Sequence, residues 1–294
     1  MQKSSNKIVF FGSFEFAVSV LETLVGAGYN IAAVLTNPDK PAGRNQIPSS
    51  PPVKLAAQKL NLPVLQPDSL KDLNMVKGLS TVGPDIGIVA AYGKIIPPEI
   101  FNLPRHGILV IHPSLLPKYR GPSPVQTAIL NGDLNTGVTI MKIDNELDHG
   151  DIVAAADYKL SLATFSQEAH AALFKLGAEL LIKTLPDYLA DKIKPKPQDH
   201  SLATFTRKFK AEDGEIKQTD TSETAYRKIL AFNPEPGAYV WLENKGKKLR
   251  LKILDASFAD GKLELKVVQL EGGKAMIAKE FSSGHSNFSE NLLY

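Results

Sequence analysis

The chain has 294 residues, enough for roughly two domains, and its 43% hydrophobic and 22% charged residues are ordinary for a globular protein with sizeable cores. It contains no cysteine, which excludes disulfides, thiolate metal sites and cysteine nucleophiles. With 34 Lys and Arg against 31 Asp and Glu, the net charge of +3 is too small to indicate a nucleic-acid partner by itself. The first apolar run, Ile8–Phe11, is too short for a signal peptide, and no later run is long enough for a membrane span, so we expect a cytoplasmic protein.

The first two thirds of the chain alternate between strand-like and helix-like patterns. Near-continuous apolar runs, typical of strands buried on both faces, occupy Ile8–Phe11, Ile31–Leu35, Ile86–Ala90, Ile108–Ile111 and Val138–Ile143. Helical patterns cover Phe16–Val25, Val53–Leu60, Pro124–Leu130 and Gln167–Leu189, the last with Ser166 as its N-cap. This alternation predicts an α/β fold with a doubly wound, mostly parallel sheet.

The pattern changes near residue 190. Pro195 and Pro197 cannot continue a helix, so residues 190–206 are predicted to form an extended basic linker between a domain at 1–189 and a second domain at 207–294. One helix is predicted around Glu223–Leu230. Four β-like runs separated by turn signals follow it, at Tyr239–Leu242, Leu249–Ala256, Leu263–Leu270 and Ala275–Ala278. This spacing is typical of a small antiparallel barrel or sandwich.

The turn after the first predicted strand argues against a dinucleotide cofactor. Phe11-Gly12-Ser13-Phe14 places a single glycine there, whereas a dinucleotide-binding turn needs three for close approach to the pyrophosphate. The sequence also lacks a glycine-rich phosphate loop ending in Lys-Ser/Thr. NAD, FAD and nucleotide-phosphate binding are therefore disfavoured.

A histidine follows the fourth predicted strand. His112 ends the run from Gly107, and the loop after it is stiffened by Pro113, Pro117 and Pro122. In open α/β sheets, ligands bind beyond the carboxyl ends of the strands, where this histidine would project. A stiff loop holds a site with little entropy lost on binding. A proline-rich surface loop beside a strand-end histidine with no chemical role is the alternative.

A second polar segment, Asp144-Asn-Glu-Leu-Asp148-His-Gly-Asp151, follows the predicted strand at Val138–Ile143. A carboxylate beside a histidine can orient the imidazole and stabilise its charged form. Two alternatives stay open. The segment could be an acidic turn bent at Gly150, or it could form a metal site with residues His112, Asp144, Asp148, His149 and Asp151, although these spacings match no zinc-helix or calcium-loop pattern.

Together these segments carry a family resemblance. His112-Pro-Ser-Leu-Leu-Pro117, followed 36 positions after the histidine by Asp148 of Leu147-Asp-His-Gly-Asp151, resembles the signature pair of the folate-dependent formyltransferases. The continuation Lys118-Tyr-Arg-Gly-Pro-Ser-Pro-Val-Gln126 narrows the resemblance, because the purine-pathway enzymes of that family diverge after Leu-Leu-Pro, whereas the aminosugar enzymes share this loop. Further segments resemble the methionyl-tRNA formyltransferases within that family: Thr36-Asn-Pro-Asp-Lys-Pro-Ala-Gly-Arg44, Ser50-Pro-Pro-Val-Lys54, Ala203-Thr-Phe-Thr-Arg-Lys208, Ala231-Phe-Asn-Pro234 and Gly273-Lys-Ala-Met276. The likeness covers essentially the whole chain.

The resemblance implies a Rossmann-like formyltransferase domain followed by a small C-terminal β-barrel resembling an OB-fold. It implies transfer of the formyl group of 10-formyltetrahydrofolate to the methionyl amine of charged initiator tRNA, without a metal, and we expect a monomer. His112 and Asp148 match the family's catalytic pair. Residues matching the folate-binding positions are Ser114, Leu115, Leu116, Pro117, Tyr92 and Ile95; those pointing to tRNA are Lys40, Arg44, Arg120, Arg207 and Lys208.

One position departs from the family pattern. The family normally has an asparagine two residues before the histidine, whose amide helps to hold the oxyanion of the tetrahedral intermediate. Here that position is Val110, which donates nothing. Loss of one such donor typically costs on the order of 10²–10³ in rate. Either catalysis is weakened, or His112 itself and a backbone amide or water replace the donor, or the chain is an altered copy. Two other functions also stay open: an aminosugar N-formyltransferase with the same chemistry, or an impaired relative that binds folate or tRNA.

Overall fold

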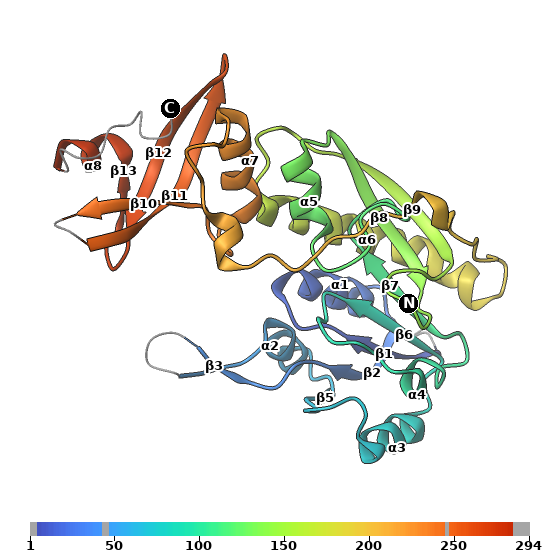
Figure 1. The fold of residues 1–294 in the computed structure, drawn as a ribbon. Helices are drawn as coiled ribbons and strands as arrows, with labels where there is room; N and C mark the ends of the chain where they lie inside the picture. Colours follow the sequence, from blue (N-terminus) through green and yellow to red (C-terminus); the bar gives the residue numbers. More distant parts are fainter. Residues whose placement is uncertain (1–4, 43–46, 245–246, 285–294) are drawn as a thin grey trace. The chain divides into compact units, whose positions relative to one another are not determined.

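The computed structural model describes residues 5–42, 47–244 and 247–284 (Figure 1). The chain folds into two compact units that alternate along the sequence. Unit 1 comprises Met1–Pro122, Thr136–Tyr158 and His170–Phe205, and unit 2 comprises Ser123–Asn135, Lys159–Ala169 and Thr206–Tyr294. The predicted linker at 190–206 thus falls almost wholly within unit 1. The functional domain boundaries at 189 and 206 stay a prediction.

Unit 1 is built on a seven-stranded sheet in the order β5-β2-β1-β6-β7-β8-β9. The strands are β1 (Lys7–Phe11), β2 (Asn30–Leu35), β5 (Val64–Leu65), β6 (Ile86–Ala90), β7 (Ile108–His112), β8 (Asn135–Lys142) and β9 (Ile152–Lys159). Every pairing from β5 to β7 is parallel, whereas β8 runs antiparallel to β7. The predicted α/β fold with a mostly parallel sheet is therefore confirmed.

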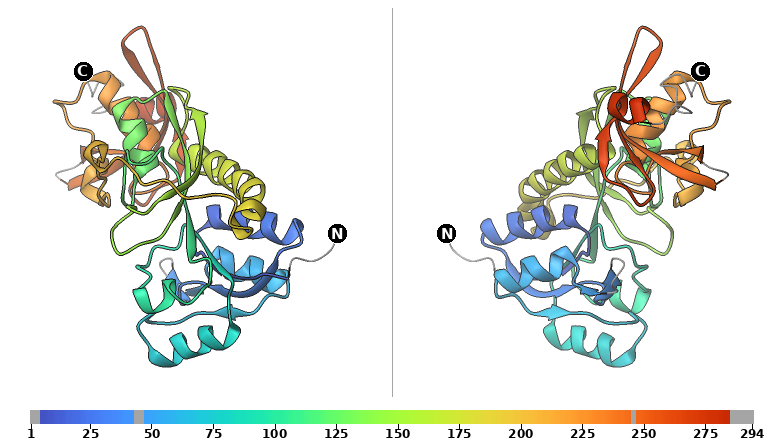
Figure 2. Two further views of the ribbon diagram at one scale, coloured as in Figure 1. Left: turned by 90° about the vertical axis from the view of Figure 1, so that its right-hand side faces the viewer. Right: turned by 90° about the vertical axis from the view of Figure 1, so that its left-hand side faces the viewer.

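Helices cover both faces of this sheet (Figures 1 and 2). On one face lie α1 (Glu15–Gly26), α2 (Pro52–Lys59) and α6 (Ser166–Leu189), and on the other α3 (Leu73–Val82) and α4 (Pro98–Phe101). Leu109 and Ile111 of β7 share a core with the first group, and Ile108 shares a core with the second. Because strand side chains alternate, Val110 and His112 point to the same face as Ile108.

Some local elements differ from the prediction. Helix α3 was not predicted, although Asp72 caps its first turn by accepting from the Asn74 N–H and Gly83 closes it in the left-handed conformation. Strand β5 and helix α4 were also missed, since two and four residues give too little periodicity to read. Ser166 is the first residue of α6 rather than its N-cap, and its hydroxyl donates to the Asn233 carbonyl oxygen at 3.1 Å.

Unit 2 joins helices α5 (Pro124–Asn131) and α7 (Ser222–Phe232) to an antiparallel sheet in the order β10-β11-β12-β13. Its strands are β10 (Tyr239–Asn244), β11 (Lys247–Ala259), β12 (Lys262–Leu270) and β13 (Ala275–Ile277), and α8 (Ala278–Gly284) follows them. The predicted turn at Asp260–Gly261 joins β11 to β12 with φ values of 49° and 75°, as a type I′ hairpin requires. The pairing gives a four-stranded sheet with β10 and β13 at its edges.

Within the described ranges, no helix combines the length and the apolar character needed to cross a membrane.

Candidate active site

His112 lies at the carboxyl end of β7, which is flanked in the unit 1 sheet by β6 and β8. It is the last residue of β7, and it pairs with Thr139 on β8. On the other side, Ile111 pairs with Ala90, the last residue of β6, from which the chain leads to Tyr92. The histidine is 5% exposed, so its imidazole is fixed inside the fold rather than displayed on the surface.

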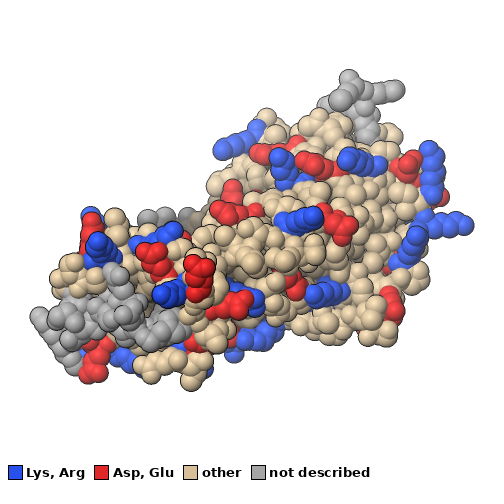
Figure 3. All heavy atoms as spheres, turned by 90° about the horizontal axis from the view of Figure 1, so that it is seen from above, with Lys and Arg blue, Asp and Glu red and all other residues tan. Residues whose placement is uncertain are grey.

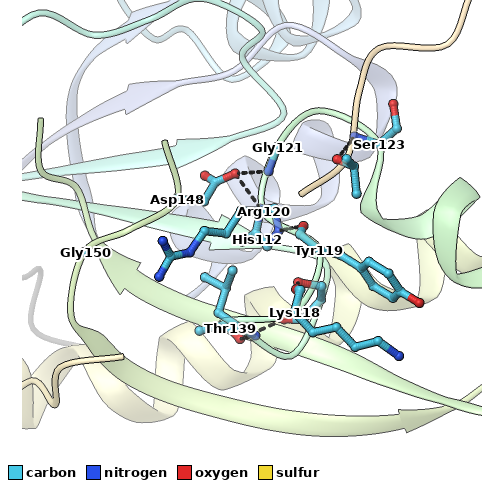
Figure 4. Close-up of polar contacts among 12 residues, drawn as sticks. His112, Lys118, Tyr119, Arg120, Gly121, Ser123, Thr139, Asp148 and Gly150 are labelled. Atoms are coloured by element: carbon cyan, nitrogen blue, oxygen red, sulfur yellow. Dashed lines mark hydrogen bonds and ion pairs between the residues drawn. The ribbon is translucent and has the colours of Figure 1, made fainter. Parts of the chain in front are cut away.

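The loop after His112 folds back onto the histidine (Figure 4). The Thr139 hydroxyl donates to the Ser114 carbonyl oxygen at 2.7 Å and accepts from the Leu116 N–H at 3.1 Å. The Ser114 hydroxyl donates to the Lys118 carbonyl oxygen at 2.6 Å. These bonds turn the loop so that the Tyr119 carbonyl oxygen lies 2.9 Å from His112 Nε2.

This interaction decides which imidazole nitrogen can act as a base. A carbonyl oxygen only accepts, so Nε2 of His112 carries the hydrogen, and in the neutral ring Nδ1 holds the free lone pair. Nδ1 lies 3.6 Å from Oδ2 of Asp148, beyond hydrogen-bond distance but within ion-pair distance, so the carboxylate faces the nitrogen that carries the lone pair.

Asp148 is held in a left-handed backbone conformation with φ of 47°. The Gly121 N–H donates to its Oδ2 at 2.7 Å, and the side chain is 15% exposed. Two residues on, a side chain on Gly150 would lie 1.8 Å from the Lys142 carbonyl oxygen, so only glycine fits there. The structure thus brings together His112 and Asp148 from two distant segments.

A third segment, 196–204, contacts both loops, and its part in the site was missed from the sequence. Gln198, 5% exposed, donates from Nε2 to the carbonyl oxygens of Asp148 (3.0 Å) and Gly150 (2.8 Å). Its Oε1 accepts from Nη2 and Nε of Arg120 at 2.7 and 3.2 Å. Arg120 Nη2 also lies 2.8 Å from His200 Nδ1.

The histidine beside Asp148 points elsewhere. His149 Nδ1 lies 2.6 Å from Asp144 Oδ2, and its ring stacks on His200 with the ring centres 3.9 Å apart and the planes at 4°. His149 therefore contacts Asp144 and His200, and these side chains do not converge on a common position where a metal ion could bind. Over the part of the chain that the structure describes, no group of three or more His, Asp or Glu side chains could hold a metal ion.

Comparisons with known proteins show the family of the chain. The family "Formyl transferase" matches residues 6–185, and "Formyl transferase, C-terminal domain" matches residues 208–262. A methionyl-tRNA formyltransferase from Chloroflexus aurantiacus is 46% identical over 255 residues, which are 87% of this chain and 82% of that protein. The chain belongs to the methionyl-tRNA formyltransferase family. It is therefore an enzyme of formyl transfer.

Solved structures of other formyltransferases have a similar fold. A methionyl-tRNA formyltransferase from Clostridium thermocellum superposes with a TM-score of 0.62 and 21% identity, covering 90% of this chain and 98% of that one. A sugar N-formyltransferase from a Shewanella species gives a TM-score of 0.64 at 18% identity, covering 84% and 96%. These likenesses establish the architecture of the chain, since the identities are too low to carry substrate choice.

The residues predicted to bind folate follow the carboxyl ends of two adjacent strands, β6 and β7. Ser114 and Leu116 are buried in the loop after β7. Tyr92 is 2% exposed, its hydroxyl has no hydrogen-bond partner among the described residues, and burial raises the pKa of Tyr92 to about 12. Ile95 is 91% exposed, an unusual position for a large apolar side chain. Leu115 and Pro117, which belong to the same loop, are half-buried.

The residues predicted to contact tRNA differ in their surroundings. Lys40, which opens β3 (Lys40–Ala42) of a small hairpin with β4 (Ile47–Ser49), is exposed, as is Lys208. Arg44 lies outside the described residues. Arg120 is 3% exposed and bonded to Gln198. On the face shown in Figure 3, basic and acidic side chains are interspersed rather than gathered by sign.

Arg207 is engaged within unit 2. Its guanidinium donates to both carboxylate oxygens of Asp213 at 2.8 and 2.5 Å, which lowers the pKa of Asp213 to about 2. The same carboxylate accepts from the Lys210 N–H at 2.7 Å. Because both carboxylate oxygens are occupied, Arg207 is bound to its partner in a fixed, forked geometry.

This pair predicts a pH-dependent contribution to stability. The pKa of Asp213 is lower in the folded state than its ordinary value of 3.8, so its stabilisation is present above about pH 4 and lost as the pH falls through about 2. We expect Asp213→Asn to lower the free energy of unfolding by about 1 kcal/mol or less at neutral pH and to flatten its fall in acid. Urea unfolding at a series of pH values checks this. The control Asp157→Asn, at an exposed position on β9, should keep the wild-type slope.

Val110 shares the sheet face of His112. It is half-buried, opposite Val89 of β6 and Met141 of β8 in the strand register. The side chain two residues before the histidine therefore lies beside it on the same face, as the family's asparagine would. Valine fills the place without offering a hydrogen bond.

Proposed function

We propose that this protein, acting as a monomer in the cytoplasm, transfers the formyl group of 10-formyltetrahydrofolate to the amino group of methionine on charged initiator tRNA for translation initiation. The observation that carries the proposal is the meeting of His112 and Asp148 at the carboxyl end of β7, with 3.6 Å between Nδ1 and Oδ2. Family membership supplies the class of reaction, and these two side chains supply the proton transfers that it needs.

The reaction requires a proton to move between two nitrogens. The methionyl amine attacks the formyl carbon, and the bond from that carbon to the folate nitrogen breaks. Nδ1 of His112 accepts the proton that the amine loses, and the same nitrogen returns it to the leaving folate nitrogen. Between these events the ring is charged, and the Asp148 carboxylate offsets that charge. No covalent enzyme intermediate is needed, which is consistent with a chain lacking cysteine.

The tetrahedral intermediate also carries a negative oxygen. With Val110 in place of an amide, the protonated Nδ1–H of His112, together with a backbone amide or a water, is proposed to donate to that oxygen. The His112 imidazole then both transfers the proton and stabilises the negative charge on the oxygen of the tetrahedral intermediate. We therefore expect turnover below what the site would reach with a second donor.

Exposed apolar surface supports the folate assignment. Ile95 follows Tyr92 at the carboxyl end of β6, the strand adjacent to β7, and is 91% exposed. An isoleucine that ligand binding covers gains about 1.5–3 kcal/mol from burial. A flat aromatic ligand such as the pterin of folate suits such a surface.

The substitution Ile95→Ser tests the proposed contact between Ile95 and folate. We expect the KM for 10-formyltetrahydrofolate to rise roughly tenfold, because a lost burial of about 1.4 kcal/mol corresponds to that factor. The thermal unfolding midpoint should stay unchanged, since the side chain makes no core contact at 91% exposure. Leu73→Ser, at a 72% exposed leucine of α3, is the matched control and should change neither quantity. An unchanged KM in Ile95→Ser would remove Ile95 from the folate site.

We propose that exposed basic residues contact the phosphates of the tRNA. Lys40 on the hairpin and Lys208 at the start of the C-terminal segment can reach phosphates, and such contacts make affinity fall with salt. Arg44 stays in the proposal from the family resemblance, and Arg207 would have to share its guanidinium with Asp213. Arg120 stays a prediction as a tRNA contact, with its guanidinium buried against Gln198 in this structure.

One assay distinguishes the proposed function from two others, an aminosugar N-formyltransferase and an impaired relative. A nucleotide-aminosugar acceptor is disfavoured because the sugar N-formyltransferase from Shewanella is 18% identical, against 46% for the tRNA enzyme from Chloroflexus. An impaired relative is favoured only by Val110. Incubation of the protein and 10-formyltetrahydrofolate with methionyl initiator tRNA, and separately with a nucleotide aminosugar, distinguishes all three: formylation of the tRNA alone supports the proposal.

A further inference from the structure

We propose that Gln198 is a positioning residue for the catalytic carboxylate, holding Asp148 at its working distance from His112. The inference rests on the proposed function, because it assigns Gln198 a role in formyl transfer through Asp148. Gln198 touches neither His112 nor the Asp148 carboxylate in the structure's hydrogen bonds, and it therefore acts through the backbone of the loop that carries Asp148.

The loop that carries Asp148 needs holding from outside. Its backbone at Asp148 has φ of 47°, a conformation that non-glycine residues adopt only when their surroundings impose it. Segment 144–151 contains no helix or strand that could fix it. Each displacement of this backbone changes the 3.6 Å separation between His112 Nδ1 and Asp148 Oδ2.

Gln198 supplies this support with one amide group. Nε2 donates both of its hydrogens to the loop, to the carbonyl oxygens of Asp148 and Gly150. Oε1 accepts two N–H groups of Arg120, which precedes the Gly121 that bonds the Asp148 carboxylate. A closed ring results, in which the 120–121 segment holds the carboxylate directly and holds its backbone through Gln198. No other side chain offers two donors and one acceptor at this length.

The segment that carries Gln198 is itself anchored on both sides. The backbones of Ile152 and Lys196 exchange two hydrogen bonds of 2.8 Å, which place the segment beside the Asp148 loop. At its other end, Thr204 accepts from the Arg120 N–H through its carbonyl oxygen and from the Tyr119 N–H through its hydroxyl, both at 2.8 Å. Residues 196–204 therefore act as a strap across the two loops that bring His112 and Asp148 together.

Glutamate at this position separates positioning from simple stability. In Gln198→Glu the carboxylate still accepts from Arg120, now as a buried charge pair, but it donates nothing to the carbonyl oxygens of Asp148 and Gly150. We expect kcat for formylation of methionyl-tRNA to fall by about 10- to 100-fold, because small misplacements of a catalytic group have effects of this size. KM for each substrate should stay within about twofold, and the thermal unfolding midpoint within about 4 °C.

A matched control and a double variant identify the route of the effect. Gln58→Glu makes the same chemical change on the exposed side of α2 and should leave kcat unchanged. In an Asp148→Asn background, adding Gln198→Glu should lower kcat by less than about threefold further, because a residue that acts through Asp148 has nothing left to position. Should Gln198→Glu fail to fold, Gln198→Asn serves with the same criteria, since it keeps the amide but is too short to reach both partners.

The outcomes are distinct. An active wild-type enzyme with an unchanged kcat in the folded Gln198 variant would overturn the inference, as would a loss of undiminished size in the Asp148→Asn background. Loss of kcat in Gln58→Glu as well would overturn it by showing a general effect of the added charge. A wild-type protein that formylates no methionyl-tRNA defeats the proposed function itself, which is a separate result.

Discussion

Replacement of His112 by glutamine is expected to lower kcat for formyl transfer by about 10²–10⁴-fold, the range that one positioned acid–base group contributes. Glutamine places its Nε2 near the position of the imidazole Nε2, so the bond to the Tyr119 carbonyl oxygen can persist. What disappears is the basic nitrogen that faces Asp148 at 3.6 Å. The variant therefore removes the base and preserves the loop, and single-turnover kinetics with saturating substrates measure the loss directly.

A second histidine provides the control. His106 precedes β7, at the opposite end of the strand from His112, and lies 3.9 Å from Asp191 through Nδ1. His106→Gln makes the same chemical change away from the carboxyl edge of the sheet and should keep kcat within about twofold of wild type. If His112→Gln lost no more activity than His106→Gln, the proton transfer would belong to another group.

Replacement of Val110 by asparagine is expected to raise kcat, an unusual direction for a substitution in a folded site. The position is half-buried on the His112 face, between Val89 and Met141, and asparagine is close to valine in size. Its amide would add a donor beside the histidine for the negative oxygen of the tetrahedral intermediate. We expect a gain of up to about 10²-fold in kcat, with KM for 10-formyltetrahydrofolate nearly unchanged, because the donor acts on the transition state.

Steady-state kinetics of Val110→Asn beside Val110→Ala test this donor effect. The alanine variant opens space at this position without adding an amide, and it should stay within a few-fold of wild type in kcat. An increase in both variants would show that space, and not hydrogen bonding, limits the reaction. An unchanged or lower kcat in Val110→Asn would show that this chain already holds the oxyanion by another group.

The architecture of unit 1 could be predicted because strands that are buried on both faces of a sheet are apolar at nearly every position, which is visible in the sequence. Ile86–Ala90 and Ile108–Ile111 are apolar at nearly every position, and they became the adjacent parallel strands β6 and β7. The hairpin at Asp260–Gly261 was predictable for a local reason, since both residues tolerate positive φ. These features depend on neighbours in sequence, and for that reason they could be read without coordinates.

The support of the site could not be predicted in the same way. Gln198 bonds Arg120 at a separation of 78 residues and Asp148 at 50, and no periodicity or motif marks such a pairing. Arg120 itself looked like a surface cation, because its burial depends on an acceptor from a distant segment. The close approach of Gly150 to the Lys142 carbonyl oxygen spans a shorter loop, and from the sequence the glycine was recognised only as the bend of an acidic turn.

We propose that His112 and Asp148 carry out the proton transfers by which this chain formylates methionine on tRNA. The most direct measurement gives purified protein 10-formyltetrahydrofolate and initiator tRNA charged with labelled methionine, and quantifies formylmethionine after deacylation. We expect formylmethionine with the wild-type protein and a loss of about 10²-fold or more in both His112→Gln and Asp148→Asn. Formylation that survives both substitutions, or a wild-type protein that formylates only a nucleotide aminosugar, would contradict it.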